Sequence, residues 1–166
     1  MNKRSKINVA LLALIVLVAA LLFLTTGKQV AEQQPSVSAI DRGSINSISV
    51  SRKDRKELRF IKDNTWQMVS PRTAPANPTR INAILSVLQA RSYTQFDAAG
   101  MDLDRFDLAH PAVTLKLNDH EFRFGGSNPL EGRRYLLFRQ TIYMIDDGLY
   151  QQLQQPAQFF IQPRDK

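Results

Sequence analysis

An uninterrupted apolar run near the N-terminus constrains this chain more than any other feature of its sequence. Residues 7–24 read INVALLALIVLVAALLFL, with no charged residue and with Asn8 as the one polar side chain. A helix needs about 20 apolar residues to cross a bilayer core of ~30 Å, and Thr25 and Thr26 bring the run to that length. Because the run has no polar face, it does not fit an amphipathic helix of a soluble domain. We therefore expect residues 7–26 to contact the lipid bilayer as one transmembrane helix.

An uncleaved anchor and a cleaved signal peptide are the two alternatives for this segment. A signal peptide has an apolar stretch of about 7–15 residues, followed by small residues at the cleavage site. The run here is longer, the pair Thr25 and Gly27 fits a cleavage site poorly, and the better pair, Val37 and Ala39, lies too far downstream. We therefore favour a membrane anchor over residues 1–27 and keep the cleaved signal as the alternative.

The charges on either side of the run predict its orientation. Three basic residues lie within the first six, whereas only Lys28 follows the run before Arg42. Positive charge is enriched on the cytoplasmic side of membrane helices, so the N-terminus is expected in the cytoplasm and the rest in the periplasm or outside the cell. Residues 28–44, KQVAEQQPSVSAIDRGS, are mostly polar and are expected to be a flexible tether. These features predict a single-pass protein of the inner (cytoplasmic) membrane.

The remaining chain, residues 45–166, begins with apolar residues at every second position. Three such segments, around Ile48, Leu58 and Trp66, are separated by short polar links and predict an antiparallel meander of half-buried strands. Trp66 alternates with Met68 and is therefore expected in the core. The proline-rich stretch SPRTAPANP is expected to end this part of the sheet, because proline cannot donate a hydrogen bond to its neighbour.

A helix and a second set of strands follow. Asn77 and Pro78 are typical of a helix start, and the apolar residues after them have helical spacing up to Leu88. Further strands are expected at SYTQF and in alternating segments between residues 113 and 144, with turns at Asn118-Asp119 and Gln140-Thr141. A short helix, GLYQQLQQ, would begin after Asp146 or Asp147, and an apolar tail around Phe160 would pack on the sheet. The expected fold is α+β, with one mostly antiparallel sheet and two short helices packed on it.

This order of landmarks resembles a known bacterial family. The segments TWQMVSP, NPTRINAILSVLQ, LDRFDLAHPAVTLKL, FRFGG, RRYLLF and TIYMID, with the final short helix, are similar to the domain-of-unknown-function family 4340 over residues 45–163. The resemblance implies a domain held by one N-terminal helix, in some members as an auxiliary part of ABC-type transport systems linked to gliding motility. It implies no catalytic residues. Where the family has Tyr/Phe-Gly-Leu, this chain has Phe106-Asp107-Leu108, and Asp107 can adopt the positive φ that such a glycine would have.

The stretch FGGSNPLEGRRYLLF, residues 124–138, is the one that could be taken for a phosphate-binding loop. A P-loop requires a strand, a glycine-rich turn and Lys-Ser/Thr at the start of a helix. Here strands are expected on both sides, and no GK[ST] is present. We therefore interpret the stretch as the link of a hairpin, with its glycines at positive-φ positions. Arg133 and Arg134 are adjacent in a strand, so they are expected to point to opposite faces and not to form one clamp.

Other candidate sites fail on spacing. Asp102, Asp104 and Asp107 lack the glycine and the final glutamate of a calcium loop. His110 and His120 have no metal-ligand spacing, no serine lies in GxSxG, and the sequence has no cysteine. We therefore expect no catalytic, cofactor-binding or metal-binding residues, no cofactor, and no enzymatic activity.

The charge pattern and the lack of a catalytic set lead to two functional hypotheses. The chain has 22 Lys+Arg against 15 Asp+Glu, a mild excess without the clustered basic face of a nucleic-acid-binding protein. The basic stretch SRKDRKELRFIKD, residues 51–63, is a solvated hairpin or, alternatively, a contact with anionic lipid headgroups. The leading hypothesis is a non-enzymatic binding or scaffold module, whose partners would be protein subunits of an envelope or transport complex. The alternative is a periplasmic sensor or carrier with a small ligand between helix 78–90 and the sheet.

Overall fold

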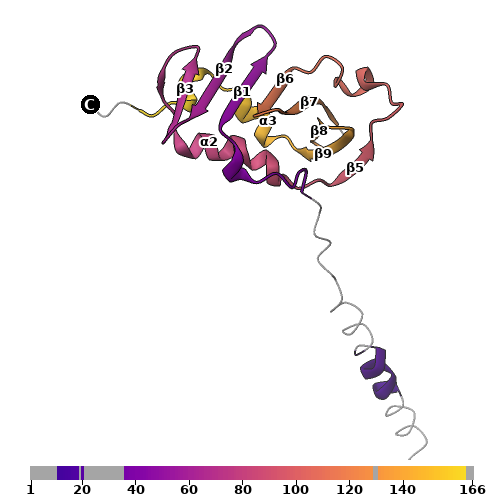
Figure 1. Ribbon diagram of the computed structural model, residues 1–166. Coiled ribbons are helices and arrows are strands. Elements are labelled where there is room, and N and C mark those ends of the chain that lie inside the picture. Colours follow the sequence, from indigo (N-terminus) through magenta and orange to yellow (C-terminus); the bar gives the residue numbers. More distant parts are fainter. Residues whose placement is uncertain (1–10, 19, 21–35, 129–130, 164–166) are drawn as a thin grey trace, which may run out of the picture. The chain divides into compact units, whose positions relative to one another are not determined.

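The computed structural model of the chain describes residues 11–18, 20, 36–128 and 131–163 (Figure 1). The chain divides into two units, Met1–Gln33 and Gln34–Lys166. In the first unit residues 11–18 are helical and their side chains are exposed. Among the described residues, no helix has the length and apolar character that a membrane crossing requires. Most of the anchor expected over residues 1–27 lies outside the described residues.

The second unit, here called the sheet domain, is built on one antiparallel sheet of nine strands (Figure 1). The strands are β1 (Ser47–Arg52), β2 (Arg55–Lys62), β3 (Trp66–Ser70), β4 (Ala74–Pro75), β5 (Thr94–Asp97), β6 (Val113–Leu117), β7 (His120–Asn128), β8 (Arg133–Phe138) and β9 (Thr141–Asp146). Their order in the sheet is β4-β3-β2-β1-β6-β7-β8-β9-β5. Two meanders, β1–β4 and β6–β9, therefore meet where β1 pairs with β6. The expected α+β fold with an antiparallel sheet is confirmed.

Short helices connect and cover the strands. They are η1 (Arg42–Ser44), α2 (Pro78–Leu85), η2 (Ser86–Gln89), η3 (Leu103–Phe106), α3 (Gly148–Leu153) and η4 (Ala157–Phe160). Asn77 caps α2 as predicted, because its side chain accepts hydrogen bonds from the backbone N–H groups of Thr79 at 3.0 Å and Arg80 at 3.3 Å. Asp147 occupies the equivalent position before α3, but its carboxylate binds Arg134 and Gln151 and does not cap the helix.

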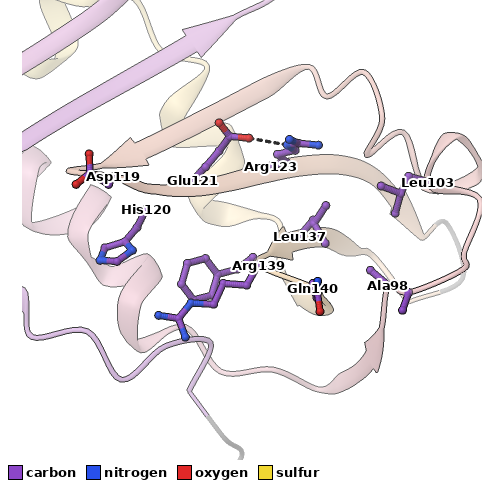
Figure 2. Close-up of a pocket in the computed structure, with 11 residues that line it drawn as sticks. Ala98, Leu103, Asp119, His120, Glu121, Arg123, Leu137, Arg139 and Gln140 are labelled. Atoms are coloured by element: carbon purple, nitrogen blue, oxygen red, sulfur yellow. Dashed lines mark hydrogen bonds and ion pairs between the residues drawn. The ribbon is translucent and has the colours of Figure 1, made fainter.

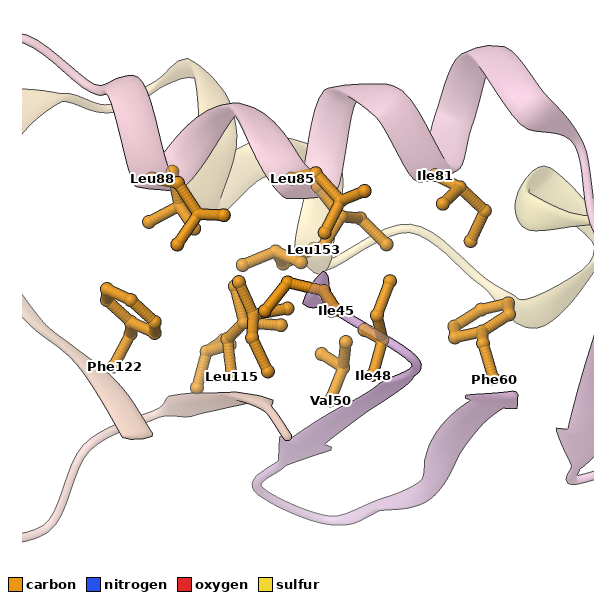
Figure 3. Close-up of a cluster of buried hydrophobic side chains, with 14 of the residues drawn as sticks. Ile45, Ile48, Val50, Phe60, Ile81, Leu85, Leu88, Leu115, Phe122 and Leu153 are labelled. Carbon is orange, nitrogen blue, oxygen red and sulfur yellow. The ribbon is translucent and has the colours of Figure 1, made fainter. Parts of the chain in front are cut away.

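The main core lies between one face of the sheet and the helices (Figure 3). Ile81 and Leu85 of α2 and Leu153 of α3 point toward apolar side chains of the strands, and all three are buried. The tail packs there too, since the Phe160 ring meets the Phe60 ring edge-on at a centroid distance of 6.0 Å. These side chains fill the space where the alternative hypothesis placed a ligand between residues 78–90 and the sheet.

Three local features differ from the sequence-based expectation. Trp66 is only partly buried and packs on the rim of the core, while Met68 on the same strand is fully buried. Pro75 does belong to the sheet, because β4 pairs with β3 at the edge, where a missing N–H is tolerated. The last hairpin turns at Arg139 and Gln140, one residue earlier than expected, and Thr141 already begins β9.

The sheet domain begins before the expected boundary at residue 45. The Val37 side chain is buried, and its N–H donates to the Ala90 carbonyl at 3.1 Å. Arg42 donates to the backbone and side-chain oxygens of Asn82 at 3.1 and 2.7 Å. Residues 36–44, which the sequence assigned to the tether, therefore lie along α2 and η2 as part of the sheet domain.

The other face of the sheet carries a second, smaller core. Leu137 of β8 and Ile142 of β9 are buried there against Leu108, which belongs to the segment between β5 and β6. Phe106 of the same segment meets the Tyr135 ring at a centroid distance of 5.0 Å. The 98–112 segment thus covers the β8–β9 part of this face.

Candidate functional site

The glycines of FGGSNPLEG have a steric role, and the expected positive φ is absent from the first two. Gly125 and Gly126 lie within β7, at a bulge opposite β8, and neither has a positive φ. A Cβ on Gly125 would lie 2.2 Å from the Phe106 carbonyl oxygen. Only the third glycine, Gly132, has a positive φ, of 64°. The pair of glycines therefore allows the 98–112 segment to approach the strand closely.

Asp107, which stands where the family pattern has glycine, has a positive φ. Asp107 has φ 55° and ψ 28° and ends η3 in the left-handed region. Its carboxylate lies over Gly126, since a Cβ there would be 2.6 Å from the Asp107 Oδ2 atom. Aspartate thus adopts the backbone conformation of a glycine and places its side chain on the neighbouring strand.

Arg133 and Arg134 point to opposite faces, as predicted. Arg134 is buried, binds Asp147 and the Gly125 carbonyl, and has its Cζ atom 3.5 Å from the centre of the Tyr150 ring. Arg133 is ion-paired with Glu131 at 2.6 Å on the other side. Arg134 therefore joins the β7 bulge to the start of α3, and strands β7 and β8 flank the stretch on both sides, as expected for a hairpin.

The basic stretch at residues 51–63 has a structural role in part. Arg52 is buried and donates to the carbonyls of Gln155 at 2.6 Å and Leu153 at 3.4 Å, while Arg55 donates to the Gln154 carbonyl at 2.6 Å. Two guanidinium groups thus bind the carbonyls at the C-terminal end of α3, which attract positive charge. Burial, followed by the charge of Arg55, lowers the pKa of Arg52 below its ordinary value.

Replacement of Arg52 by methionine tests this structural role. Arg52→Met keeps the apolar stem but leaves the Leu153 and Gln155 carbonyls without the Arg52 donor, so we expect a loss of about 2 kcal/mol in the free energy of unfolding. Urea denaturation of Arg52→Met and of Lys53→Met, an exposed neighbour, measures the difference. Equal stability of the two variants would contradict the capping role.

The acidic and histidine candidates are not brought together into a metal site. Asp102 caps η3, with its Oδ1 atom accepting from the Asp104 N–H at 3.1 Å. His110 is exposed in the 98–112 segment, whereas His120 begins β7. Across the described residues, no group of three or more His, Cys, Asp or Glu side chains could hold a metal ion.

The largest of the described cavities is a groove that the sequence analysis did not predict (Figure 2). This first groove has a volume of 530 Å³ and lies beside the β6–β7 and β8–β9 turns, with the start of the 98–112 segment on its other side. Its apolar wall consists of Ala98, Ala99, Leu103, Leu137 and Phe138, and its polar rim of Asp119, His120, Glu121, Arg123, Arg139 and Gln140. An apolar surface with a few polar groups at its border is typical of binding sites.

An ion-pair network lies on the rim of the first groove. Glu121 accepts from Arg123 at 2.6 Å and from Lys116 at 3.2 Å. The hydrogen bond from Arg123 is the largest cause that lowers the pKa of Glu121 below its ordinary value, while burial opposes it. At neutral pH the negative charge of Glu121 is therefore already compensated by two cations.

The lowered pKa predicts a weak dependence of stability on pH. A carboxyl group with a depressed pKa in the folded state contributes stability above its unfolded pKa of about 4.3, and this contribution is lost as the pH falls through the folded pKa. Because the pair is partly exposed, we expect less than ~1 kcal/mol. A carbon-detected NMR titration of Glu121 should give a midpoint below the ordinary value, and Arg123→Gln should raise it. A midpoint unchanged by Arg123→Gln would rule out the ion pair as its cause.

A second groove adjoins the first. It has a volume of 390 Å³ and is lined by residues 36–40, Phe138, Arg139, Thr141 and Tyr143. The two grooves share Phe138 and Arg139. The segment through which the chain enters the sheet domain, residues 36–40, therefore forms a wall of the second groove.

Comparison with known proteins identifies the family and nothing closer. No curated protein and no solved structure matches the sequence. Residues 66–164 match the family described as a domain of unknown function, DUF4340. The matched range begins at β3 and omits β1 and β2, which the resemblance had included from residue 45. It nevertheless covers more than half of the chain, so the protein belongs to the DUF4340 family of domains of unknown function.

Proposed function

We propose that the protein is a membrane-anchored, non-enzymatic binding module that acts outside the inner membrane as part of an envelope or transport complex. Its anchor is the apolar run at residues 7–26, and its binding surface is the pair of grooves in the sheet domain. The partner is a protein subunit of that complex. No nucleic acid is involved, since the net charge is mild and the basic hairpin is partly engaged with α3.

The main observation that supports this proposal is that the chain enters the sheet domain beside the second groove. The β6–β7 turn is tied to the entry segment, because Asn118 donates to the Ser44 carbonyl at 2.9 Å and accepts from the N–H groups of Asn46 and Ser47. The next two residues of that turn border the first groove. A module held by its N-terminus would therefore present the grooves on the side of its attachment.

The distance between the anchor and this end of the domain is limited by the chain itself. Residues 27–35 separate the apolar run from Ser36, the first described residue of the sheet domain. An extended chain spans at most ~3.3–3.6 Å per residue, so these residues cover about 30 Å at most.

The geometry also restricts the alternative of a small-ligand sensor or carrier. Packed side chains fill the space between α2 and the sheet, so a small ligand is better placed in the first groove, the larger of the two grooves. Its volume is within the range of about 300–1,000 Å³ that small-molecule sites have. This alternative places the ligand on the same residues as the proposed protein contact.

Site-specific photocrosslinking in native membranes tests the protein-binding role. A photoreactive residue at Gln140, exposed at the first groove, is expected to capture a discrete membrane or envelope protein that mass spectrometry identifies. The matched control is Lys53, exposed at the β1–β2 turn, which lies at the opposite end of β1 from the β6–β7 turn that borders the first groove.

Each outcome of this experiment is decisive for the binding surface. An adduct at position 140 and none at position 53 supports the grooves as the contact. Equal adducts at both positions, or none at either, would contradict it. Membrane fractionation of the same cells checks the anchor separately, because recovery of a shortened protein in the soluble periplasm would establish the cleaved signal.

A further inference from the structure

The two edges of the nine-stranded sheet are closed to different degrees. At one edge β4 contains Pro75, whose carbonyl accepts from the Gln162 N–H at 3.0 Å, so the C-terminal tail pairs along it. At the other edge β5 is the last strand and pairs with β9 (Figure 1). An open edge presents N–H and C=O groups to another extended chain, and proline or a covering segment blocks such an edge. Of the two edges, β5 is therefore the one to which a further strand can be added.

The backbone groups of β5 that point away from β9 belong to Gln95 and Asp97. The Ala98 N–H donates to the Gln140 carbonyl at 2.8 Å, so the backbone of Ala98 points toward the β8–β9 hairpin. Because this direction alternates along a strand, Phe96 also bonds toward β9, whereas Gln95 and Asp97 face outward. In the part of the chain that the structure describes, no hydrogen bond joins their backbone groups to a segment other than β9. Each of the two residues therefore offers one N–H and one C=O group at the edge.

The side chains of β5 do not obstruct its open edge. Three of its four residues are exposed, and Phe96 is half-buried against the Phe106 ring at a centroid distance of 5.8 Å. The strand contains neither the proline nor the lysine that commonly protect an edge. Its one charged residue is Asp97, whose carboxylate accepts from the Ala99 N–H at 2.9 Å. The edge therefore offers backbone groups next to one apolar side chain.

The strand β5 is continuous with the first groove. Ala98 and Ala99 follow β5 directly and line the groove, together with Gln140 of the neighbouring hairpin. Phe96 packs in the second core with Leu137, and Leu137 also borders the groove. A chain that pairs with β5 has every second side chain on the face that carries Phe96, so apolar residues there would extend the second core toward the groove.

We propose that the protein partner binds as an additional strand on β5, with its backbone bonded to Gln95 and Asp97. This inference rests on the proposed function and deepens it, because it names the form of the partner: an extended segment with apolar residues at alternate positions. Strand addition takes its affinity from main-chain hydrogen bonds and its specificity from pockets that receive alternate side chains. Here the first groove is the pocket beyond the end of β5, and Phe96 is the apolar neighbour along the strand.

Proline at position 95 tests the strand pairing in the full-length protein. Gln95→Pro removes one outward N–H, and proline is tolerated at edge positions whose N–H faces solvent, so the melting temperature should change little. Gln95→Ala is the matched control, because it shortens the side chain and keeps the N–H. With the photoreactive residue at position 140 in native membranes, Gln95→Ala should retain the partner adduct. Gln95→Pro should lower the yield of that adduct by about tenfold.

A photoreactive residue at position 95 gives a second measurement that does not depend on the stability of the proline variant. Because the added strand would lie directly beside this position, it should capture the same protein as position 140. Failure of position 95 to capture that protein would overturn the proposal, whatever the melting temperature of Gln95→Pro.

The outcomes separate this inference from the proposed function. Equal adducts in Gln95→Pro and Gln95→Ala would overturn the strand pairing, while the adduct at position 140 would still support the first groove as the contact. Capture of a second copy of this chain at position 95 would also overturn the inference, because no separate partner would then occupy β5. Absence of any adduct at position 140 would contradict the proposed function and this inference together.

Discussion

A Gly125→Ala variant is expected to lose about 3 kcal/mol of its free energy of unfolding, the largest effect per added atom in this domain. The new Cβ would lie 2.2 Å from the Phe106 carbonyl oxygen and 2.9 Å from two atoms of Leu108. The first of these is a backbone atom, so it cannot move unless the 98–112 segment moves with it. Arg134 holds the same position from the other side by binding the Gly125 carbonyl. Chemical denaturation of the variant measures the loss.

Two other glycines provide a graded control for this prediction. At Gly126 the nearest atom to a new Cβ is the Asp107 Oδ2 atom at 2.6 Å, the end of a side chain that can rotate away, so Gly126→Ala should cost less. At Gly148 nothing lies within 4 Å, and the position begins α3, so Gly148→Ala should be neutral or stabilising by about 0.5–1 kcal/mol. A different order of the three losses would contradict the close approach of the 98–112 segment.

Phe60→Ala should cost about 3–5 kcal/mol, the usual range for loss of a buried phenylalanine. Phe60 is fully buried, and its ring meets Phe160 of the C-terminal tail. The variant should therefore also release the tail, which limited proteolysis after η4 would detect. Phe60→Leu keeps most of the volume and should retain most of the stability.

The stability loss of Trp66→Ala can be compared with that of Phe60→Ala, because Trp66 packs at the edge of the same core. Its alternation with Met68 predicted a core tryptophan, but the side chain is partly exposed at the rim. Trp66→Ala is therefore expected to be less damaging than Phe60→Ala. If the Trp66 variant proves the less stable of the two, the assignment of the main core to Phe60 and its neighbours is wrong.

Features that depend on neighbouring residues were predicted well from the sequence. Alternation located the strands around Ile48 and Leu58, because a half-buried strand exposes every second side chain. The cap at Asn77 was predicted because a helix start has local requirements. A positive φ at Asp107 was expected on the condition that the family's glycine has one, because aspartate is among the few residue types that tolerate it.

Features that depend on distant residues were not predicted. Residues 36–44 have the composition of a polar tether, and the backbone bond between Val37 and Ala90 joins positions more than fifty residues apart. Arg52 looked like one of several solvated charges, and its role comes from the α3 carbonyls of Leu153 and Gln155. Nothing in a linear pattern pairs residue 52 with residues about a hundred positions later.

The grooves were missed for a similar reason. The first groove is formed by two turns and a connecting segment, each of which reads as an ordinary polar loop. One local signal was present, since the last hairpin turns at Arg-Gln where turns favour Asn, Asp or Gly. An unfavoured residue type at a tight turn would have marked Arg139 for attention.

The pairing of β1 with β6 has a consequence for the order in which the protein acquires its structure. Each meander can form from neighbours in sequence, but β1 waits for a partner that follows β2, β3, β4, α2 and β5 along the chain. Closing so long a loop costs entropy before the contacts between β1 and β6 compensate for it. Such long-range strand pairings therefore form slowly. During synthesis, one edge of β1 stays unpaired until β6 has been made. The nascent N-terminal meander is therefore the form of this protein most prone to aggregation.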